Sequence, residues 1–215
     1  MIMKCKVLLL SAVLLCCVTG LYAQVGIKAG INMSNEILSF QQPGDGVGFK
    51  SSNLTGYQLG LVYQAMPANS GIGIETGVLL SQKGSSFNDT SSSAGVIKQG
   101  YKELTFLEVP LNVRYHLLFG SVGLYGFAGL YAGYALSCKM VDETTNVTQN
   151  GVYPGFTDHV DYGVHFGAGL EFFKKIQFGA TWSQGLKNST VTIAGLSTPV
   201  KAKNRMYSIS LVYLL

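Results

Sequence analysis

The chain ends in the segment Tyr207-Ser208-Ile209-Ser210-Leu211-Val212-Tyr213-Leu214-Leu215. Every second residue from Leu215 back to Tyr207 is apolar or aromatic, and two of the residues between them are serine. This alternation predicts a β-strand with one apolar face that runs to the last residue. A soluble domain rarely ends in this way, because an exposed apolar edge strand promotes aggregation. A transmembrane β-barrel does, because its last strand closes the cylinder against the first and faces lipid.

The amino-terminal residues have the three-part pattern of a secretory signal peptide. Lys4 and Lys6 precede an apolar core, Val7 to Val18. This core is too short to cross a bilayer as a helix, which needs about 20 residues. We predict a signal peptide over residues 1–23 and an outer-membrane β-barrel domain over residues 24–215.

The cysteines exclude two kinds of site in the mature chain. Cys16 and Cys17 leave a lipoprotein alternative open, although Leu15 stands where lipid attachment requires a small residue. Removal of the signal peptide also removes Cys5 and leaves Cys138 alone, so an intramolecular disulfide and a cysteine-based metal site are excluded.

Composition limits the function further. The formal net charge of +4 falls to +2 when the two lysines of the signal peptide are removed, and the basic residues are scattered singly. Such a pattern excludes a nucleic-acid-binding surface. About 190 mature residues suit one domain. The mature chain has no run of 18 apolar residues, so a membrane span would have to be built from strands.

The mature sequence contains eight alternating segments. In the fifth, we expect Leu124, Ala128, Leu130 and Tyr134 to face lipid, although Tyr125, Phe127 and Tyr131 make the opposite face equally bulky. The eight segments are residues 25–33, 54–64, 71–82, 104–115, 121–136, 161–173, 176–186 and 203–215.

Long and short connections alternate between these segments. The long ones are residues 34–53, 83–103, 137–160 and 187–202, and the short ones are 65–70, 116–120 and 174–175. Barrels of the outer membrane have short periplasmic turns and longer extracellular loops. The sequence therefore predicts an all-β fold, an eight-stranded antiparallel up-and-down transmembrane barrel with both termini in the periplasm.

Aromatic residues near the strand ends predict two interfacial belts. We place Tyr63, Tyr115, Phe172, Phe178 and Tyr213 at the periplasmic interface. We place Tyr57, Tyr134, Tyr162, Trp182 and Tyr207 at the outer interface. A soluble lipocalin-like barrel is the alternative fold, and it would carry its apolar residues inside.

The chain resembles the porin-family, or PorT-like, outer-membrane β-barrel proteins of bacteria. The resemblance lies in Gly26-Ile27-Lys28-Ala29-Gly30-Ile31-Asn32, Leu107-Glu108-Val109-Pro110-Leu111-Asn112-Val113-Arg114-Tyr115, Gly167-Ala168-Gly169-Leu170-Glu171 and the closing strand. One departure is Leu215, where such barrels usually end in Phe. The resemblance implies residence in the outer-membrane lipid and insertion as a monomer by the barrel-assembly machinery. It does not imply an open channel, since eight strands leave an interior that side chains can fill.

Charged residues on the inward faces predict a polar network in the lumen. Its members are Lys28, Glu75, Glu108, Arg114 and Glu171, with His165 and Asp161 as further candidates. Buried charges need partners, so we interpret this set as a structural salt-bridge network, with a narrow polar path or small-ligand site as the alternative. Pro110 predicts a bulge, because it removes a ladder donor.

We expect a structural or surface-binding role rather than catalysis, with no cofactor or metal. The long polar loops favour binding, and an envelope protein is a candidate partner. The alternatives are a narrow pore for small solutes, a component that assists secretion, and a small lipid-modifying enzyme. The candidate catalytic residues are His159 with Asp158 and Asp161, and the loop serines Ser85 and Ser91, whereas His116 falls in a predicted periplasmic turn.

Overall fold

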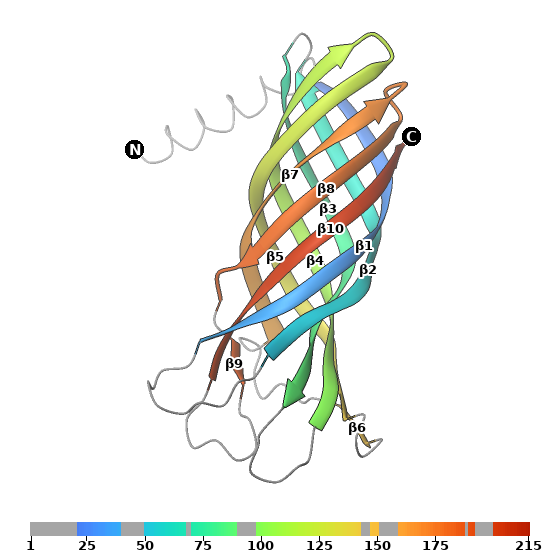
Figure 1. Ribbon diagram of the computed structural model, residues 1–215. Helices are drawn as coiled ribbons and strands as arrows, with labels where there is room; N and C mark the ends of the chain where they lie inside the picture. The colour runs from blue at the N-terminus through green and yellow to red at the C-terminus, as the bar shows by residue number, and fades with distance from the viewer. Residues whose placement is uncertain are drawn as a thin grey trace, which may run out of the picture.

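The computed structural model describes residues 21–39, 50–67, 70–89, 98–142, 147–150, 159–187, 189–191 and 200–215. Nearly all of them lie in strands (Figure 1). The eight long strands are β1 (Leu21–Ser39), β2 (Lys50–Pro67), β3 (Ile72–Asp89), β4 (Lys98–Phe119), β5 (Val122–Asp142), β7 (Val160–Phe172), β8 (Ile176–Gly185) and β10 (Val200–Leu214). Two short strands, β6 (Val147–Asn150) and β9 (Ser189–Val191), extend β5 and β10.

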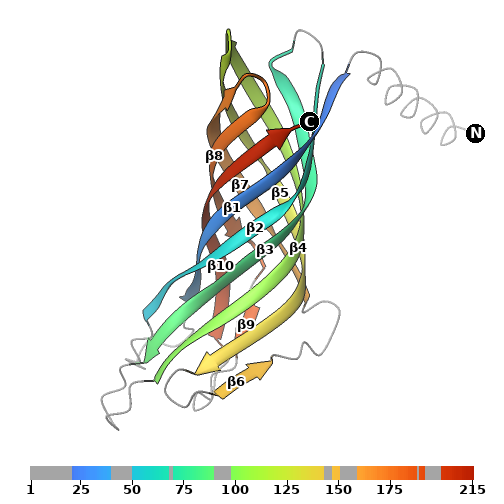
Figure 2. The ribbon, with the colours of Figure 1, turned by 90° about the vertical axis from the view of Figure 1, so that its right-hand side faces the viewer.

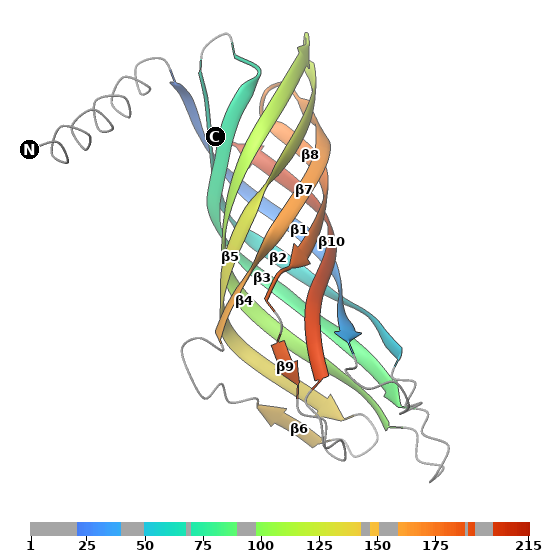
Figure 3. The same cartoon turned by 90° about the vertical axis from the view of Figure 1, so that its left-hand side faces the viewer.

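The eight long strands form one closed antiparallel barrel. Each pairs with the next along the chain, in the order β1-β2-β3-β4-β5-β7-β8-β10, and β1 also pairs with β10. Views from two sides show the same continuous wall of tilted strands (Figures 2 and 3). The predicted eight-stranded up-and-down barrel is confirmed. Among the described residues, no helix is long and apolar enough to cross a membrane.

The closing seam follows the predicted pairing. The ladder between β1 and β10 includes Gly26 opposite Leu214 and Met33 opposite Tyr207, and β10 pairs with β8 on its other side. Beyond the last rung, the Leu215 amide donates to the Val25 carbonyl at 2.9 Å. Closure gives both edge strands backbone partners, which a sheet in lipid requires because no water is present to replace them.

The strands are longer than predicted on the side of the long connections. β3 continues to Asp89 and β4 begins at Lys98, so much of the predicted connection 83–103 is strand. Outside the bilayer both faces of a strand can be polar, so the ladder continues where the alternation stops. β1 begins at Leu21, and residues 1–20, which hold most of the predicted signal peptide, lie outside the described residues.

At the other end the connections are tight. Phe173 and Lys174 have φ of 54° and 58°, and the Lys175 amide donates to the Phe172 carbonyl at 3.0 Å. Positive φ at both central residues is the type I′ geometry whose twist matches a hairpin. Figure 3 shows β6 and β9 at the end of the barrel opposite the carboxyl terminus. Short turns at one end and long connections at the other assign the carboxyl-terminal end to the periplasm.

The barrel is apolar outside and polar inside. Val113 and Ile209 on the outer wall are 62% and 64% exposed, whereas Asn32 and Gln177 are 0% exposed. In the fifth predicted segment, Leu124 and Leu130 face outward and Tyr125 and Tyr131 face inward, as expected. A lipocalin-like barrel would have the opposite arrangement, so this alternative is wrong.

The predicted bulge at Pro110 is also wrong. The register between β3 and β4 is the same on both sides of it, with Thr76 opposite Leu111 and Leu79 opposite Glu108. The Thr76 hydroxyl donates to the Pro110 carbonyl at 2.8 Å and ties the two strands together there. The irregularity of β4 lies instead at Thr105/Phe106, in its pairing with β5.

Candidate functional site

The five charged residues predicted for the lumen all lie inside the barrel. They come from four strands: Lys28 from β1, Glu75 from β3, Glu108 and Arg114 from β4, and Glu171 from β7. Each is at most 9% exposed. Charges held this far from water need close partners, and the contacts below supply most of them.

Glu75 is the centre of the first cluster. It forms an ion pair with Arg114, and it accepts hydrogen bonds from Gln64 Nε2 at 2.8 Å and from Asn112 Nδ2 at 3.2 Å. The Arg114 guanidinium also lies 3.8 Å from the ring centroid of Tyr125, a cation–π contact. Both oxygens of the Glu75 carboxylate therefore have donors, which offsets the cost of its burial.

Two glutamines connect opposite sides of the lumen. Gln64 on β2 and Gln177 on β8 donate to each other's amide oxygens at 3.0 and 3.1 Å. Gln177 Nε2 also donates to Glu171 at 2.6 Å, and His116 Nε2 lies 3.2 Å from the same carboxylate. Because β1 and β10 separate β2 from β8 around the wall, this amide pair bridges across the interior.

Lys83 is the centre of a second cluster, nearer the extracellular end. Its ammonium forms an ion pair with Glu108 and lies 3.6 Å from Asp161 Oδ2. Asn204 and the Tyr131 hydroxyl donate to the same Asp161 oxygen at 3.2 and 3.4 Å. The ammonium also lies 4.3 Å from the Tyr131 ring centroid. The buried Lys83 ammonium thus neutralises two carboxylates that come from two different strands, Glu108 on β4 and Asp161 on β7.

Side chains fill the space between the clusters. His165 Nε2 contacts Asn112 Oδ1 and connects the Glu75 cluster to β7, past the intervening strand β5. Lys28 and Gln58 border an internal cavity of about 20 Å³, and Gln58 Nε2 has no hydrogen-bond partner. A cavity of this size holds about one water molecule. The polar interior is therefore packed rather than open where the structure describes it.

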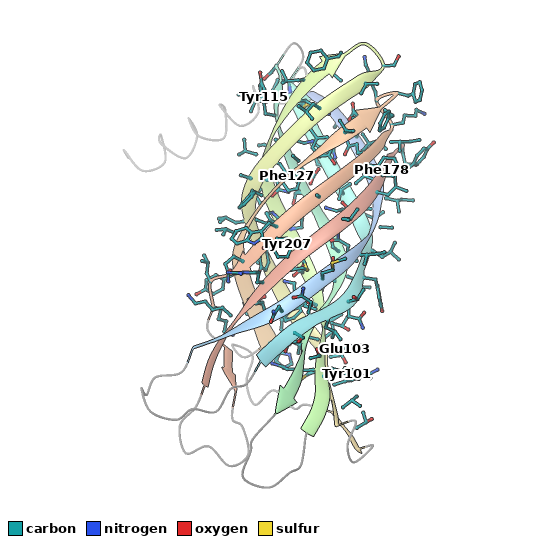
Figure 4. The ribbon with its side chains drawn as sticks, in the orientation of Figure 1. Tyr101, Glu103, Tyr115, Phe127, Phe178 and Tyr207 are labelled. Carbon is teal, nitrogen blue, oxygen red and sulfur yellow. The ribbon has the colours of Figure 1, made fainter. Side chains whose placement is uncertain are left out.

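The predicted interfacial aromatics lie on the outer wall. Tyr57, Tyr63, Tyr115, Tyr162, Tyr207 and Tyr213 are exposed. Tyr134 and Trp182 are half-buried, because the first stacks on His159 and the second packs against Phe166. Figure 4 shows Tyr115 near the periplasmic end and Tyr207 about halfway along, with Glu103 and Tyr101 farther toward the extracellular end. The wall thus continues beyond the outer aromatic residues.

Residues 17–191 match the family described as "Outer membrane protein beta-barrel domain". The chain belongs to this family. As a member of it, the protein is an integral β-barrel of the bacterial outer membrane. The match confirms the resemblance and the location predicted from the strand motifs.

Among solved structures, OprG shares the fold at low sequence identity. OprG from Pseudomonas aeruginosa is 12% identical, with a TM-score of 0.52 over 91% of this chain and 97% of its own. Ail of Yersinia pestis, solved in complex with the heparin analogue sucrose octasulfate, is 14% identical with a TM-score of 0.43 over 90% and 99%. Neisserial surface protein A is 8% identical with a TM-score of 0.44 over 89% and 97%. No curated protein matches by sequence.

Several lumen residues of this family member fall outside the predicted set. Lys83 lies in strand β3, where the sequence predicts a loop, because residues 81–86 are polar on both faces of the strand and give no alternation to mark it. His116 was assigned to a periplasmic turn but is buried in β4 beside Glu171, because β4 extends to Phe119. Gln64 and Gln177 carry no charge, so the pattern of inward charges does not mark them.

The candidate catalytic residues have other contacts in this barrel. His159 Nδ1 lies 2.8 Å from the Ala135 carbonyl, and Asp161 belongs to the Lys83 cluster. Ser85 is buried in β3. Two further candidates lie outside the described residues: Asp158 and Ser91. The described residues contain no group of His, Cys, Asp and Glu side chains that could hold a metal ion.

Cys138 is a free thiol buried against Leu104, Phe106 and Ala135. This small apolar cluster lies on the inner side of the wall at the bulge between β4 and β5, where the Thr105/Phe106 irregularity changes which side chains face inward. Its surroundings are those of a packing residue rather than a reactive thiol, which needs a polar and accessible site.

Proposed function

We propose that the protein is a closed structural barrel of the outer membrane that presents its extracellular end for binding, and is neither a solute channel nor an enzyme. The observation that carries this proposal is the amide bridge between Gln64 and Gln177, which crosses the lumen. A continuous water path would have to pass this bridge and both charge clusters.

The charge balance of the interior supports a structural role. Each carboxylate of the two clusters has a cation or an amide donor within contact distance: Glu75, Glu108, Asp161 and Glu171. A conducting or ligand-binding lumen needs charges that face water or a large vacant site. Here the four carboxylates face cations or amide donors, and the cavity that Lys28, Lys83 and Glu108 border holds only about 20 Å³. Such a network favours one strand register over others, since a shifted register would separate the partners.

The conductance of the purified barrel in planar lipid bilayers tests the closed state. The wild-type protein should give no discrete current steps above those of the bare bilayer. The double variant Gln64→Ala/Gln177→Ala removes the cross-lumen bridge and should increase ion leakage. Discrete conductance steps from the wild-type protein would refute the proposal and favour the narrow-pore alternative.

The proposal of surface binding rests on the part of the barrel wall that extends past the outer interfacial aromatic residues toward the extracellular end. β4 begins at Lys98, and half-exposed Tyr101 and Glu103 lie far from the periplasmic end (Figure 4). A rigid sheet that carries loops above the membrane is a common platform for recognition. Crosslinking in native outer membranes, followed by purification, would identify an envelope partner, including a secretion component. Recovery of the barrel only as a free monomer would contradict this part of the proposal.

A further inference from the structure

The outer wall carries an apolar groove of about 770 Å³ across β7, β8, β10 and β1. Its floor contains the small side chains Ala168 and Ala180, which lie directly opposite each other on β7 and β8. The next residue in the same row is Ile209 on β10. These strands lie side by side in Figures 1 and 2. Small side chains between larger ones leave a depression that lipid or another apolar surface must fill.

An aromatic ridge borders the groove on its extracellular side. Phe166, Trp182 and Tyr207 occupy successive strands in one row, and the row continues to Met33 on β1. The rings of Phe166 and Trp182 lie 4.9 Å apart, centroid to centroid. Phe178 and Leu211 form the opposite, periplasmic border. The depression therefore runs around the wall between two ridges within the outer half of the apolar band.

Two exposed cations follow the aromatic ridge on β10. Arg205 precedes Tyr207 by two residues and Lys203 by four, which is roughly 7 and 13 Å along the strand. Both side chains share the outward face with Tyr207, and Arg205 Nε lies 3.5 Å from Gln184 Oε1 on β8. Residues 176–187 and 200–215 contain no Asp or Glu. The one carboxylate of β1, Glu36, lies opposite Asn204, on the rung between the two cations, and is not opposite either of them.

We propose that this surface binds one phosphate-bearing lipid of the outer leaflet, with an acyl chain in the groove and the phosphate at Arg205 and Lys203. The order of features along β10 matches such a lipid: apolar groove, amphipathic aromatic ridge, then cations. Arginine pairs well with phosphate because its guanidinium offers two parallel donors. Near an anionic membrane surface each Lys or Arg contributes appreciably to lipid binding.

Charge favours a lipid over a second copy of the barrel. A symmetric dimer through this face would bring Arg205 and Lys203 of both copies together at one interface. Those like charges would repel, whereas a phosphate group would neutralise them. Lipid chains also leave little hydrophobic drive for barrel association, since both surfaces are already in an apolar solvent.

Native mass spectrometry of the delipidated, folded barrel tests the proposal. The probes are lipid A with two phosphates and the same lipid A with one phosphate, titrated separately. The wild-type barrel should bind one molecule and prefer the two-phosphate form. The double variant Lys203→Gln/Arg205→Gln should bind this form roughly 30-fold more weakly, with two charges removed. The control Lys139→Gln, an exposed cation on β5 that does not border the groove, should bind like the wild type.

A second pair of variants tests the groove itself. Ala180→Leu should fill the floor and weaken lipid A binding without loss of fold, while Ala132→Leu on the outer face of β5 should change neither. Slower migration after boiling confirms that each variant is folded. Unchanged binding in the double variant, or an equal loss in Lys139→Gln, would overturn the proposal. A dimer that Ala180→Leu abolishes would overturn it too, and would assign the groove to a second copy.

Discussion

Glu75 shows how one buried carboxylate organises its neighbours. It pairs with Arg114 and accepts from Gln64 and Asn112, so three side chains from the two neighbouring strands converge on its two oxygen atoms. None of these partners could be replaced by water without opening the packed interior. The free energy of this cluster therefore depends on all of its members, and removal of one leaves the others unsatisfied.

Substitution Glu75→Gln should strongly destabilise the barrel, because it leaves the Arg114 guanidinium buried without its counterion. We expect a loss of about 3–5 kcal/mol in the free energy of unfolding. Urea unfolding of protein refolded into lipid vesicles measures it. The matched control is Glu103→Gln, a half-exposed carboxylate on β4, which should cost less than about 1 kcal/mol. Equal losses in the two variants would argue against a structural network.

The pairing of β5 with β7 joins aromatic residues to glycines. Tyr125 and Tyr131 on β5 lie directly opposite Gly169 and Gly163 on β7, and both rings project into the lumen across the glycine backbone. A Cβ at either glycine would overlap both the facing ring and a backbone carbonyl oxygen of β8, that of Phe178 at Gly169 and that of Gln184 at Gly163. Glycine at these positions thus gives space to side chains that also contact Arg114 and Lys83.

Gly169→Ala should therefore destabilise the barrel by about 1–3 kcal/mol, since the added methyl group clashes with the Phe178 carbonyl oxygen and displaces the Tyr125 ring from its position over Arg114. The control is Gly126→Ala on β5, where a Cβ would meet only the Gly167 carbonyl oxygen at 3.8 Å. That substitution should be neutral or slightly stabilising, because alanine restricts the unfolded chain. Unfolding curves of both variants in the same vesicles provide the comparison. If the free energy of unfolding changed by the same amount and in the same direction in both variants, the packing of the rings against the glycines would not contribute to stability.

At the scale of the whole molecule, the lipid-facing wall is the inverse of a soluble protein surface. Its exposed residues in the membrane strands are mostly aliphatic and aromatic, and buried charges such as Glu75, Lys83 and Arg114 lie inside. This arrangement is stable only in a bilayer, where the apolar wall replaces lipid-to-lipid contacts and the closed ladder satisfies the backbone. The location of the protein is thus a physical requirement of its surface.

The loss in the free energy of unfolding caused by an outward-facing arginine should depend on the depth of that arginine in the membrane. Leu111→Arg, in the middle of the apolar face of β4, should cost about 2–4 kcal/mol, and Phe119→Arg, at the periplasmic end of the same strand, about 0–1 kcal/mol. Both residues are exposed, so burial in protein cannot account for a difference. Equal costs, measured by unfolding from vesicles, would contradict the predicted membrane position of β4.

Most of the fold was predictable because each membrane strand has a local rule. Lipid contact requires an apolar side chain at every second position, so the sequence marks both the strands and their outward faces. The rule ends at the membrane surface, where outward residues are free to be polar. For this reason the extracellular ends of β3 and β4, including Lys83, were assigned to a loop, and the inward His116 was assigned to a turn.

The pattern of the sequence alone predicts the barrel, its strand order, the closing seam and the side of the wall on which each residue of the membrane strands lies. The tertiary structure alone decided which inward residues meet. Gln64 and Gln177 form their hydrogen bonds although they are 113 residues apart in the sequence. Lys83 on β3 contacts Asp161 on β7, and these two strands are not neighbours in the sheet. Such contacts depend on the register and tilt of all eight strands together, which no local pattern specifies. The terminal segment 207–215 illustrates both cases. Its alternation predicts a strand from the sequence, whereas the groove and the aromatic ridge that it helps to form exist only because β1, β7 and β8 pack beside it.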